Sequence, residues 1–290
     1  MMTLRLLALG DTLWLRLRAL RRSEQRAATD GAGVQARAAV PLRTLGDVSW
    51  PEFDTLAHSF WRAQEVTLFH RHVALVQVPV LDLGCGDGVF GQLAGWPADT
   101  TGLDFDEESL RVRAQVCPGA VNVRADAGRM PLPDATFVTC VSNSVFEHLP
   151  DLDASLREAH RVLRPGGRLM FTMTLGTFSR QLRELTGAAD ARAWLERFGH
   201  RQEPDEADLL RRVAVAGFKV EQMVSYQPQS FTARYRRLVS PVFQFNERRR
   251  PATWRARECE RLAGEVSASL ASTPAGAGAC VFVVARKEAA

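Results

Sequence analysis

Lysine is almost absent from this sequence: Lys219 and Lys287 are the only two among 37 basic residues, and the others are arginine. Because alanine is also abundant, this bias reflects composition more than a binding function. The formal net charge of +4 is too small a surplus to indicate a nucleic-acid partner. Uninterrupted apolar runs of about 18 residues are missing as well, which argues against a membrane-spanning helix.

Paired cysteines are a second absence. No CxxC pair occurs, and no histidine stands near a cysteine at the spacing of metal ligands. We therefore expect no structural zinc site and no bound metal. An odd, dispersed set of thiols is typical of a reducing compartment, so we expect a cytoplasmic protein. The cysteines are Cys85, Cys117, Cys140, Cys259 and Cys280.

Residues 1–22 are rich in leucine and arginine, and five leucines recur at helical spacing. Asp11 and Arg16 interrupt the apolar run, which disfavours a secretory signal. One interpretation is a basic amphipathic helix that rests on a membrane surface or a partner. The simpler alternative is a helix that packs its leucine stripe on the domain. Residues 23–46 are small and polar and predict a linker.

From Trp50 to Val76 the apolar residues recur with helical periodicity, which predicts a helix acting as a lid. Short β-rich runs then alternate with helix-length segments. This alternation predicts a doubly wound, mostly parallel α/β sheet with helices on both faces. The expected strands are 79–83, 100–104, 120–123, 136–142, 167–174, 218–225 and 279–286.

We divide the chain into residues 1–46, the basic helix and linker, and a domain at 47–290 with its core at 75–175. Two long connections, 176–212 and 227–278, are expected to form caps or substrate insertions. The second is rich in arginine. It indicates either an anionic surface or substrate, or only the solvated faces of helices in an arginine-biased protein.

The sharpest signal is the run Val80-Leu81-Asp82-Leu83-Gly84-Cys85-Gly86-Asp87-Gly88. An apolar strand ends in an acid and continues into alternating glycines, which let the backbone turn tightly and approach a ligand. In open α/β sheets such a turn lies where ligands bind. The dinucleotide fingerprint would need glycine at position 89, which is Val89. An acid at position 82 suits a cofactor with an ammonium and a sulfonium better than a pyrophosphate.

Polar residues also follow the next strands. Asp104 ends the second strand, where a carboxylate can accept hydrogen bonds from both hydroxyls of a ribose. Asp126-Ala127 follows the third strand. The fourth ends in Ser142-Asn143-Ser144-Val145-Phe146-Glu147-His148.

This ordered set resembles the class I S-adenosylmethionine-dependent methyltransferases, in particular the group named after the type 11 methyltransferase domain. The run from 82 to 88 is similar to motif I of that family. The resemblance implies a Rossmann-like sheet of seven strands whose last strand is antiparallel, with S-adenosyl-L-methionine as cofactor. The family commonly has Phe-Asp where this chain has Phe137-Val138, at a position whose role is mainly structural.

The resemblance also implies a set of binding residues. The ribose would be held by Asp104, and the adenine bracketed by Phe105, Asp126 and Ala127. The ammonium would contact the backbone of Ser142 or Asn143. The methionine part would be cradled by Asp82, Gly84, Cys85 and Gly86.

The catalytic candidates are His148 and Glu147, because in the family the substrate-facing loop begins there. A base is needed only when the acceptor begins protonated. His148 would be that base, with Glu147 orienting or assisting it. Alternatively, His148 packs near the cofactor without proton transfer, since alignment of the reactants supplies much of the acceleration.

We expect methyl transfer to a small organic or lipid-like acceptor. A D/N/S-P-P-Y/F/W loop is missing after the fourth strand, which disfavours DNA as a partner. Two alternatives stay open: a catalytically silent cofactor-binding regulatory subunit, and a nicotinamide-dependent oxidoreductase, against which Val89 argues. The oligomeric state and the acceptor atom have no signature in the sequence.

Overall fold

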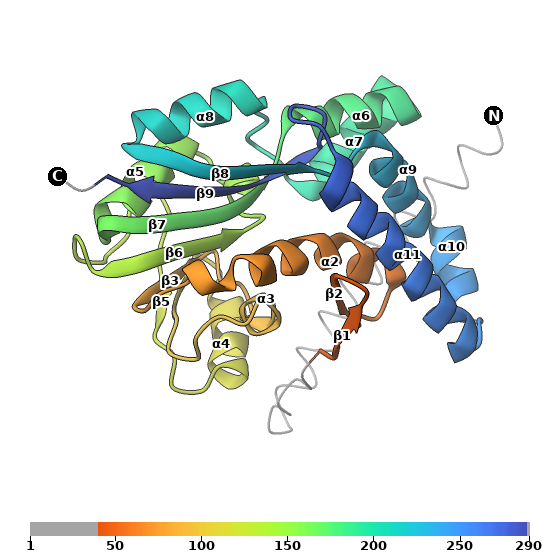
Figure 1. Cartoon of the computed structure of the whole chain (residues 1–290), viewed down its shortest axis with the longest axis horizontal. Coiled ribbons are helices and arrows are strands. Elements are labelled where there is room, and N and C mark those ends of the chain that lie inside the picture. The colour runs from red at the N-terminus through yellow and green to blue at the C-terminus, as the bar shows by residue number, and fades with distance from the viewer. Residues whose placement is uncertain (1–39, 289–290) are drawn as a thin grey trace. The chain divides into compact units, whose positions relative to one another are not determined.

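A computed structural model describes residues 40–288, which belong to one compact unit from Ala39 to Ala290. A seven-stranded sheet in the order β5-β4-β3-β6-β7-β9-β8 forms its centre (Figure 1). The strand pairs from β5 to β7 are parallel, whereas β9 is antiparallel to both β7 and β8. The predicted doubly wound fold with an antiparallel last strand is confirmed. The strands are β3 (Val80–Leu83), β4 (Thr101–Asp104), β5 (Asn122–Arg124), β6 (Phe137–Asn143), β7 (Leu163–Thr174), β8 (Phe218–Tyr226) and β9 (Cys280–Lys287).

Helices connect the strands and cover both faces of the sheet (Figure 1). Within the core they are α3 (Val89–Leu93), α4 (Glu107–Val116), α5 (Leu152–Val162) and the short 3-10 turns η1 (Val73–Leu75) and η2 (Phe146–His148). The first long connection contains α6 (Gly176–Thr186), α7 (Ala188–Phe198) and α8 (Glu206–Val215). The second contains α9 (Gln229–Leu238), α10 (Pro241–Glu247) and α11 (Ala252–Ser272). Helix α2 (Leu56–Arg71) precedes the sheet.

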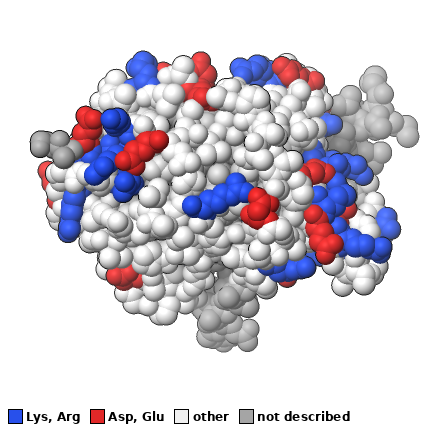
Figure 2. Space-filling model, viewed as in Figure 1, with Lys and Arg blue, Asp and Glu red and all other residues white. Residues whose placement is uncertain are grey.

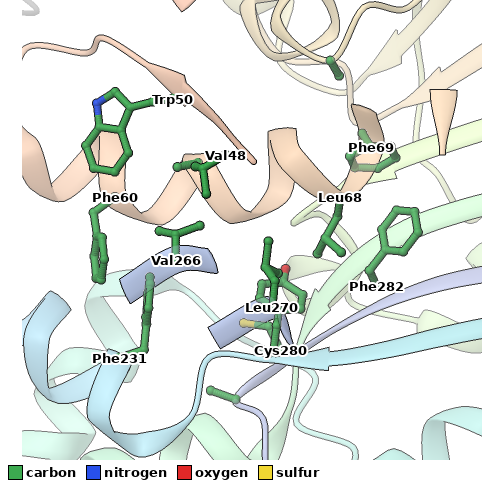
Figure 3. Close-up of a cluster of buried hydrophobic side chains, with 14 of the residues drawn as sticks. Val48, Trp50, Phe60, Leu68, Phe69, Phe231, Val266, Leu270, Cys280 and Phe282 are labelled. Atoms are coloured by element: carbon green, nitrogen blue, oxygen red, sulfur yellow. The ribbon is translucent and has the colours of Figure 1, made fainter. Parts of the chain in front are cut away.

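Two apolar cores lie on opposite faces of the sheet, because successive side chains of a strand point in opposite directions. In β9, Phe282 and Val284 belong to the core that includes α2 and α11. The intervening Val281 and Val283 belong to the other core, which includes residues of α5 and α8. Figure 3 shows the first core, where side chains of α2, α9 and α11 meet those of β9. The sheet is therefore buried on both faces, as a doubly wound sheet requires.

The segment before α2 differs from expectation. Residues predicted as linker and helix start form a two-stranded hairpin, β1 (Leu42–Leu45) and β2 (Val48–Pro51). Trp50 lies in β2 and is buried against the first core (Figure 3). The helix begins only at Leu56, because Thr55 caps it by accepting a hydrogen bond from the His58 N–H (3.2 Å). The helix prediction from Trp50 and the linker prediction to residue 46 were wrong here.

The arginine-rich connection carries its own counter-charges. Arg234 pairs with Glu265 at 3.1 Å, and Arg261 pairs with both Glu258 and Glu265. Figure 2 shows basic and acidic residues interspersed on the side where α10 and α11 lie. The prediction for residues 1–22, and most of that for 23–46, falls outside the described residues. Within residues 40–288, no helix is long and apolar enough to cross a membrane.

Candidate functional site

The glycine loop after β3 turns at the carboxyl edge of the sheet. Gly84, Gly86 and Gly88 all have positive φ angles, of 74°, 51° and 78°. A Cβ on Gly84 would overlap the side chain of Val145, and one on Gly88 would lie 2.8 Å from Arg113 Cγ. At Gly86, by contrast, no atom of the described chain lies within 4 Å of that position. Gly86 therefore leaves open space beside the backbone, as a ligand-binding loop needs.

Asp104 ends β4 directly opposite this loop. Its Oδ2 accepts a hydrogen bond from the Gly86 N–H (2.8 Å), and its Oδ1 accepts one from the Asp106 N–H (2.9 Å). The carboxylate is thereby fixed in direction while each oxygen keeps a lone pair for a further donor. The next side chain, Phe105, is 75% exposed, which is unusual for a phenylalanine and leaves its ring free to stack.

The third predicted acid lies after β5, one strand further out. The Asp126 side chain is exposed, and its Oδ1 accepts a hydrogen bond from the Gly128 N–H (2.7 Å). Ala127 is buried. The Ala125 N–H donates to the Asp104 main-chain oxygen (3.0 Å), which ties this segment to the end of β4.

At the end of β6, Ser142 and Asn143 face inward rather than toward solvent. The Ser142 hydroxyl donates to the Leu83 main-chain oxygen (2.9 Å), which joins the ends of β6 and β3. Asn143 accepts a hydrogen bond from the Thr172 hydroxyl (2.8 Å) and donates one to Glu65 (3.2 Å). The carboxyl ends of β3 and β6 are therefore brought together, as predicted for one site.

Glu65 of α2 is a site residue that the sequence analysis missed. It is fully buried and accepts hydrogen bonds from Ser144 Oγ (2.6 Å), Trp61 Nε1 (3.0 Å) and the Arg62 guanidinium (2.6 Å). The guanidinium lies 5.7 Å from the Phe90 ring centroid, on the helix that follows the glycine loop. The i, i+3 spacing of Arg62 and Glu65 was a local signal, but nothing local indicated that this face of α2 covers the strand ends.

Asp82 lies apart from these groups. Its side chain is buried and lines a cavity of about 510 Å³ with Trp96, Arg113 and Cys117. Burial raises the pKa of Asp82 to about 7, opposed by the charge of Arg113 and reinforced by that of Asp104. Burial also raises the pKa of the Cys85 thiol. The structure therefore places the Asp82 carboxyl group in a buried position along this cavity, whereas its predicted contact with the cofactor stays a prediction.

The two catalytic candidates have different environments. Glu147 is buried, and its Oε1 accepts a hydrogen bond from the Thr174 hydroxyl (3.1 Å). Burial raises the pKa of Glu147 to about 7, and the Glu65 carboxylate adds to the rise. The neighbouring His148 is exposed, with Nδ1 at 3.2 Å from the Gly199 main-chain oxygen. Its ring lies 5.1 Å from that of His200, a residue the sequence left unassigned, whose pKa falls to about 4 because of burial and the nearby His148.

Comparison with known proteins agrees with this geometry. Residues 81–171 match the family described as a methyltransferase domain, and this range runs from β3 through the glycine loop to β7. The chain carries a class I S-adenosylmethionine-dependent methyltransferase domain. The cofactor expected from the sequence, S-adenosyl-L-methionine, is that of this family.

Two curated relatives illustrate the range of similarity. A malonyl-[acyl-carrier protein] O-methyltransferase of Methylococcus capsulatus is 34% identical over 142 residues, 47% of this chain and 52% of the relative. A ubiquinone biosynthesis O-methyltransferase of Pseudomonas entomophila is 28% identical over 209 residues, 64% of this chain and 88% of the relative. The chain spans about half the length of the malonyl-specific relatives that it matches.

Solved structures show the same fold. A Thermotoga maritima S-adenosylmethionine-dependent methyltransferase, described as a possible histamine N-methyltransferase, superposes with a TM-score of 0.54. The alignment covers 80% of this chain and 92% of that one at 17% identity. At this identity the likeness establishes the fold alone.

Proposed function

We propose that this protein transfers the methyl group of S-adenosylmethionine to an oxygen of a small organic or lipid-like acceptor. The observation that carries the proposal is the open space at Gly86 beside the fixed carboxylate of Asp104. A side chain at position 86 would enter that space, so the glycine loop and the acid together form a cradle. The methyltransferase domain that contains them supports the choice of cofactor.

The residues along the edge fit a nucleoside. The lone pairs that Asp104 retains suit the two hydroxyls of a ribose. The exposed Phe105 ring offers a stacking surface for a purine, and the Asp126 carboxylate can accept from its amino group. Ala127 is small and buried, so its side chain would leave room for the purine ring.

The amino-acid end of the cofactor fits the neighbouring polar cluster of α2. Glu65 is a buried carboxylate at the ends of β3 and β6, and Arg62 is a guanidinium beside the helix after the glycine loop. A guanidinium complements the carboxylate of a free amino acid. We assign Arg62 to this end, together with the backbone at Ser142 and Asn143. Glu65, whose oxygens already accept hydrogen bonds from neighbouring side chains, positions Arg62 and Asn143.

S-adenosylmethionine, when bound, supplies a methyl group on a positively charged sulfur, which leaves as a neutral thioether when the acceptor attacks. The protein has to align the acceptor oxygen and remove its proton. Glu147 fits the second task better than His148, because its pKa is raised to about 7 and its Oε2 has no hydrogen-bond partner within the described structure. His148 lies at the exposed rim, where it would contact the acceptor.

Oxygen is the proposed acceptor atom because the two curated relatives are named O-methyltransferases, one for a malonyl carrier protein and one in ubiquinone biosynthesis. A carboxyl group and a phenolic hydroxyl are therefore the two acceptor classes to test first. Peripheral contact with a membrane through residues 1–22 belongs to the same proposal, since it would present a lipid-like acceptor.

The test is incorporation of radiolabelled methyl from S-adenosylmethionine with two acceptor sets, malonyl thioesters and long-chain catechols. We expect label in one set with the native chain and none with Asp104→Ala. Alkaline hydrolysis releases label from a methyl ester but not from an aryl ether, so it identifies the acceptor class. Cofactor binding without turnover on any acceptor, including cell-extract fractions, would instead identify a silent regulatory subunit.

A further inference from the structure

We propose that Glu147, His148 and His200 bind a divalent transition-metal ion of the Zn²⁺ class at the rim of the acceptor site. Each of the three side chains offers one ligand atom, and these atoms lie within 4.8 Å of one another. Two imidazoles and one carboxylate form a frequent ligand set of catalytic zinc and non-haem iron. This proposal departs from the expectation of no metal, and it goes beyond the proposed methyl transfer.

The carboxylate has a free ligand atom. Glu147 Oε1 is held by the Thr174 hydroxyl (3.1 Å), and Oε2 is buried without a hydrogen-bond partner among residues 40–288. A buried carboxylate oxygen without a partner carries a large desolvation cost. Coordination of a cation would satisfy that oxygen in the position where the Thr174 contact already holds it.

Neighbouring groups also hold the two histidine rings in place. The Nδ1 of His148 lies 3.2 Å from the Gly199 main-chain oxygen, which can only accept, so Nδ1 carries the proton. Nε2 then presents its lone pair, the arrangement in which an imidazole binds metal while a main-chain oxygen orients its ring. The ring of His200 packs near Phe178 and Phe198, which limits its rotation.

The three ligand atoms are further apart than around a bound ion, and side-chain rotation can bring them closer. With metal–ligand bonds of about 2.0–2.2 Å, ligand atoms around a tetrahedral ion lie about 3.3 Å apart. The ligand atoms lie within 4.8 Å of one another, so they have to approach by at most about 1.5 Å. His148 is exposed and stands on a short 3-10 turn, so its ring can move without disturbing the core.

Local charge does not oppose a cation. Arg62, whose charge acts on Glu147 and His148, is paired with Glu65 at 2.6 Å, so its charge is largely balanced. Three protein ligands leave a fourth position open, as in catalytic zinc sites. An acceptor oxygen bound there would be oriented and would lose its proton more readily. With the ion bound, Glu147 acts as its ligand, and the ion takes over the activation of the acceptor that the free carboxylate performs in the proposed methyl transfer.

The direct test is metal binding to chelator-treated, tag-free protein, measured calorimetrically with Zn²⁺ and spectroscopically with Co²⁺. We expect one equivalent of Zn²⁺ with a dissociation constant of about 1 µM or below for a site with three protein ligands. Co²⁺ should give visible absorption bands of a low-symmetry site. The variants Glu147→Gln, His148→Ala and His200→Ala should each weaken Zn²⁺ binding by about 100-fold or more, since even outer-shell partners contribute 10- to 100-fold.

The matched control is His58→Gln, which removes another exposed histidine, on α2, and should leave Zn²⁺ affinity unchanged. Circular dichroism melting and S-adenosylmethionine titration of each variant show that the fold and cofactor site persist. Unaltered Zn²⁺ binding by His200→Ala, or native binding weaker than about 100 µM, would overturn the metal site. Because cofactor titration is a separate readout, that failure would not affect the proposed methyl transfer.

Discussion

At the scale of single residues, the three glycines of the loop at 84–88 have different tasks. Gly84 and Gly88 are required by close neighbours, Val145 and Arg113, whereas Gly86 has open space beside it. The sequence predicted the loop from its spacing, and the structure shows that Gly86 alone among the three has open space beside its backbone. The difference between the tasks is testable, because all three have the positive φ that disfavours other residues.

We predict that Gly86→Ala lowers S-adenosylmethionine affinity by about tenfold or more, because its methyl group enters the cofactor space. Stability should fall by about 1–2 kcal/mol, the cost of placing alanine at positive φ. The matched control is Gly46→Ala, in the β1–β2 turn, with φ of 63° and equally open surroundings. It should show the same loss in thermal unfolding and no change in calorimetric affinity. Equal effects of the two variants on affinity would contradict the assignment.

A second residue-scale prediction concerns proton removal. Glu147→Gln keeps the size of the side chain but cannot accept a proton, so kcat should fall by about 10²–10⁴. S-adenosylmethionine affinity should remain within about twofold, because Glu147 contacts the acceptor side. The control is Glu221→Gln on β8, a carboxylate paired with Arg168, whose kcat should be unchanged. Steady-state rates with the identified acceptor measure both, and a native-like kcat for Glu147→Gln would reject this role.

Some residues of the candidate site could be predicted from the sequence, and others could not. Asp104, the glycines and the Ser142–His148 segment follow strand ends, so their convergence could be predicted from strand order alone. Glu65 and His200 lie on elements whose placement depends on tertiary packing. His200 is 52 residues after His148 in the sequence, and only the return of the chain after α7 brings their rings to 5.1 Å.

At the scale of elements, α2 brings side chains from outside the sheet to the end of β6. It carries Glu65 and Arg62, and the second connection anchors its start. The Leu56 N–H donates to Glu247 Oε1 (2.9 Å), and Arg255 pairs with the same carboxylate. Phe60 of α2 stacks on Phe231 of α9 at 3.9 Å, within the core shown in Figure 3.

We predict that Glu247→Ala destabilises the protein by about 2–4 kcal/mol, because it leaves the buried Leu56 N–H without its acceptor and Arg255 without its carboxylate partner. Its effect should extend to cofactor affinity, since α2 holds Glu65 in place. Glu260→Ala on the exposed face of α11 is the control and should remain within about 0.5 kcal/mol. Chemical denaturation measures both, and equal stability of the two variants would contradict the anchoring.

The elements themselves were predicted unevenly. All seven strands of the central sheet overlap their expected positions, because they are apolar runs bounded by turn residues. The largest differences are that β7 begins earlier than expected and that β5 begins and ends later. The hairpin before α2 was missed, since its four-residue strands are too short for a period to appear. Trp50 and Val48 are buried there through contact with α2 and α11, a tertiary effect that local periodicity does not contain.

At the scale of the whole molecule, the buried carboxyl of Asp82 couples folding to pH. Its pKa is about 7 in the folded chain, raised chiefly by burial above the value of 3.8 for a free side chain. The folded state therefore binds more protons than the unfolded state between these values. The contribution of Asp82 to stability is fully present below pH 4 and is lost as pH rises through 7.

We predict that Asp82→Asn becomes progressively more stable relative to the native chain between pH 4 and pH 7. The limiting slope is about 1.4 kcal/mol per pH unit. Urea denaturation at a series of pH values gives the difference directly. A stability difference between the two proteins that does not vary with pH would show that Asp82 is ionised normally.

The central claim is that the carboxyl edge of β3, β4 and β6 binds S-adenosylmethionine, and calorimetric titration tests it most directly. We predict micromolar binding by the native protein and a loss of about 1–3 kcal/mol in Asp104→Ala, as for lost hydrogen bonds to a fixed carboxylate. Asp99→Ala, which removes an exposed carboxylate elsewhere, should bind as tightly as the native chain. No heat with S-adenosylmethionine and a clear isotherm with NADH would contradict the account and favour a nicotinamide-dependent enzyme.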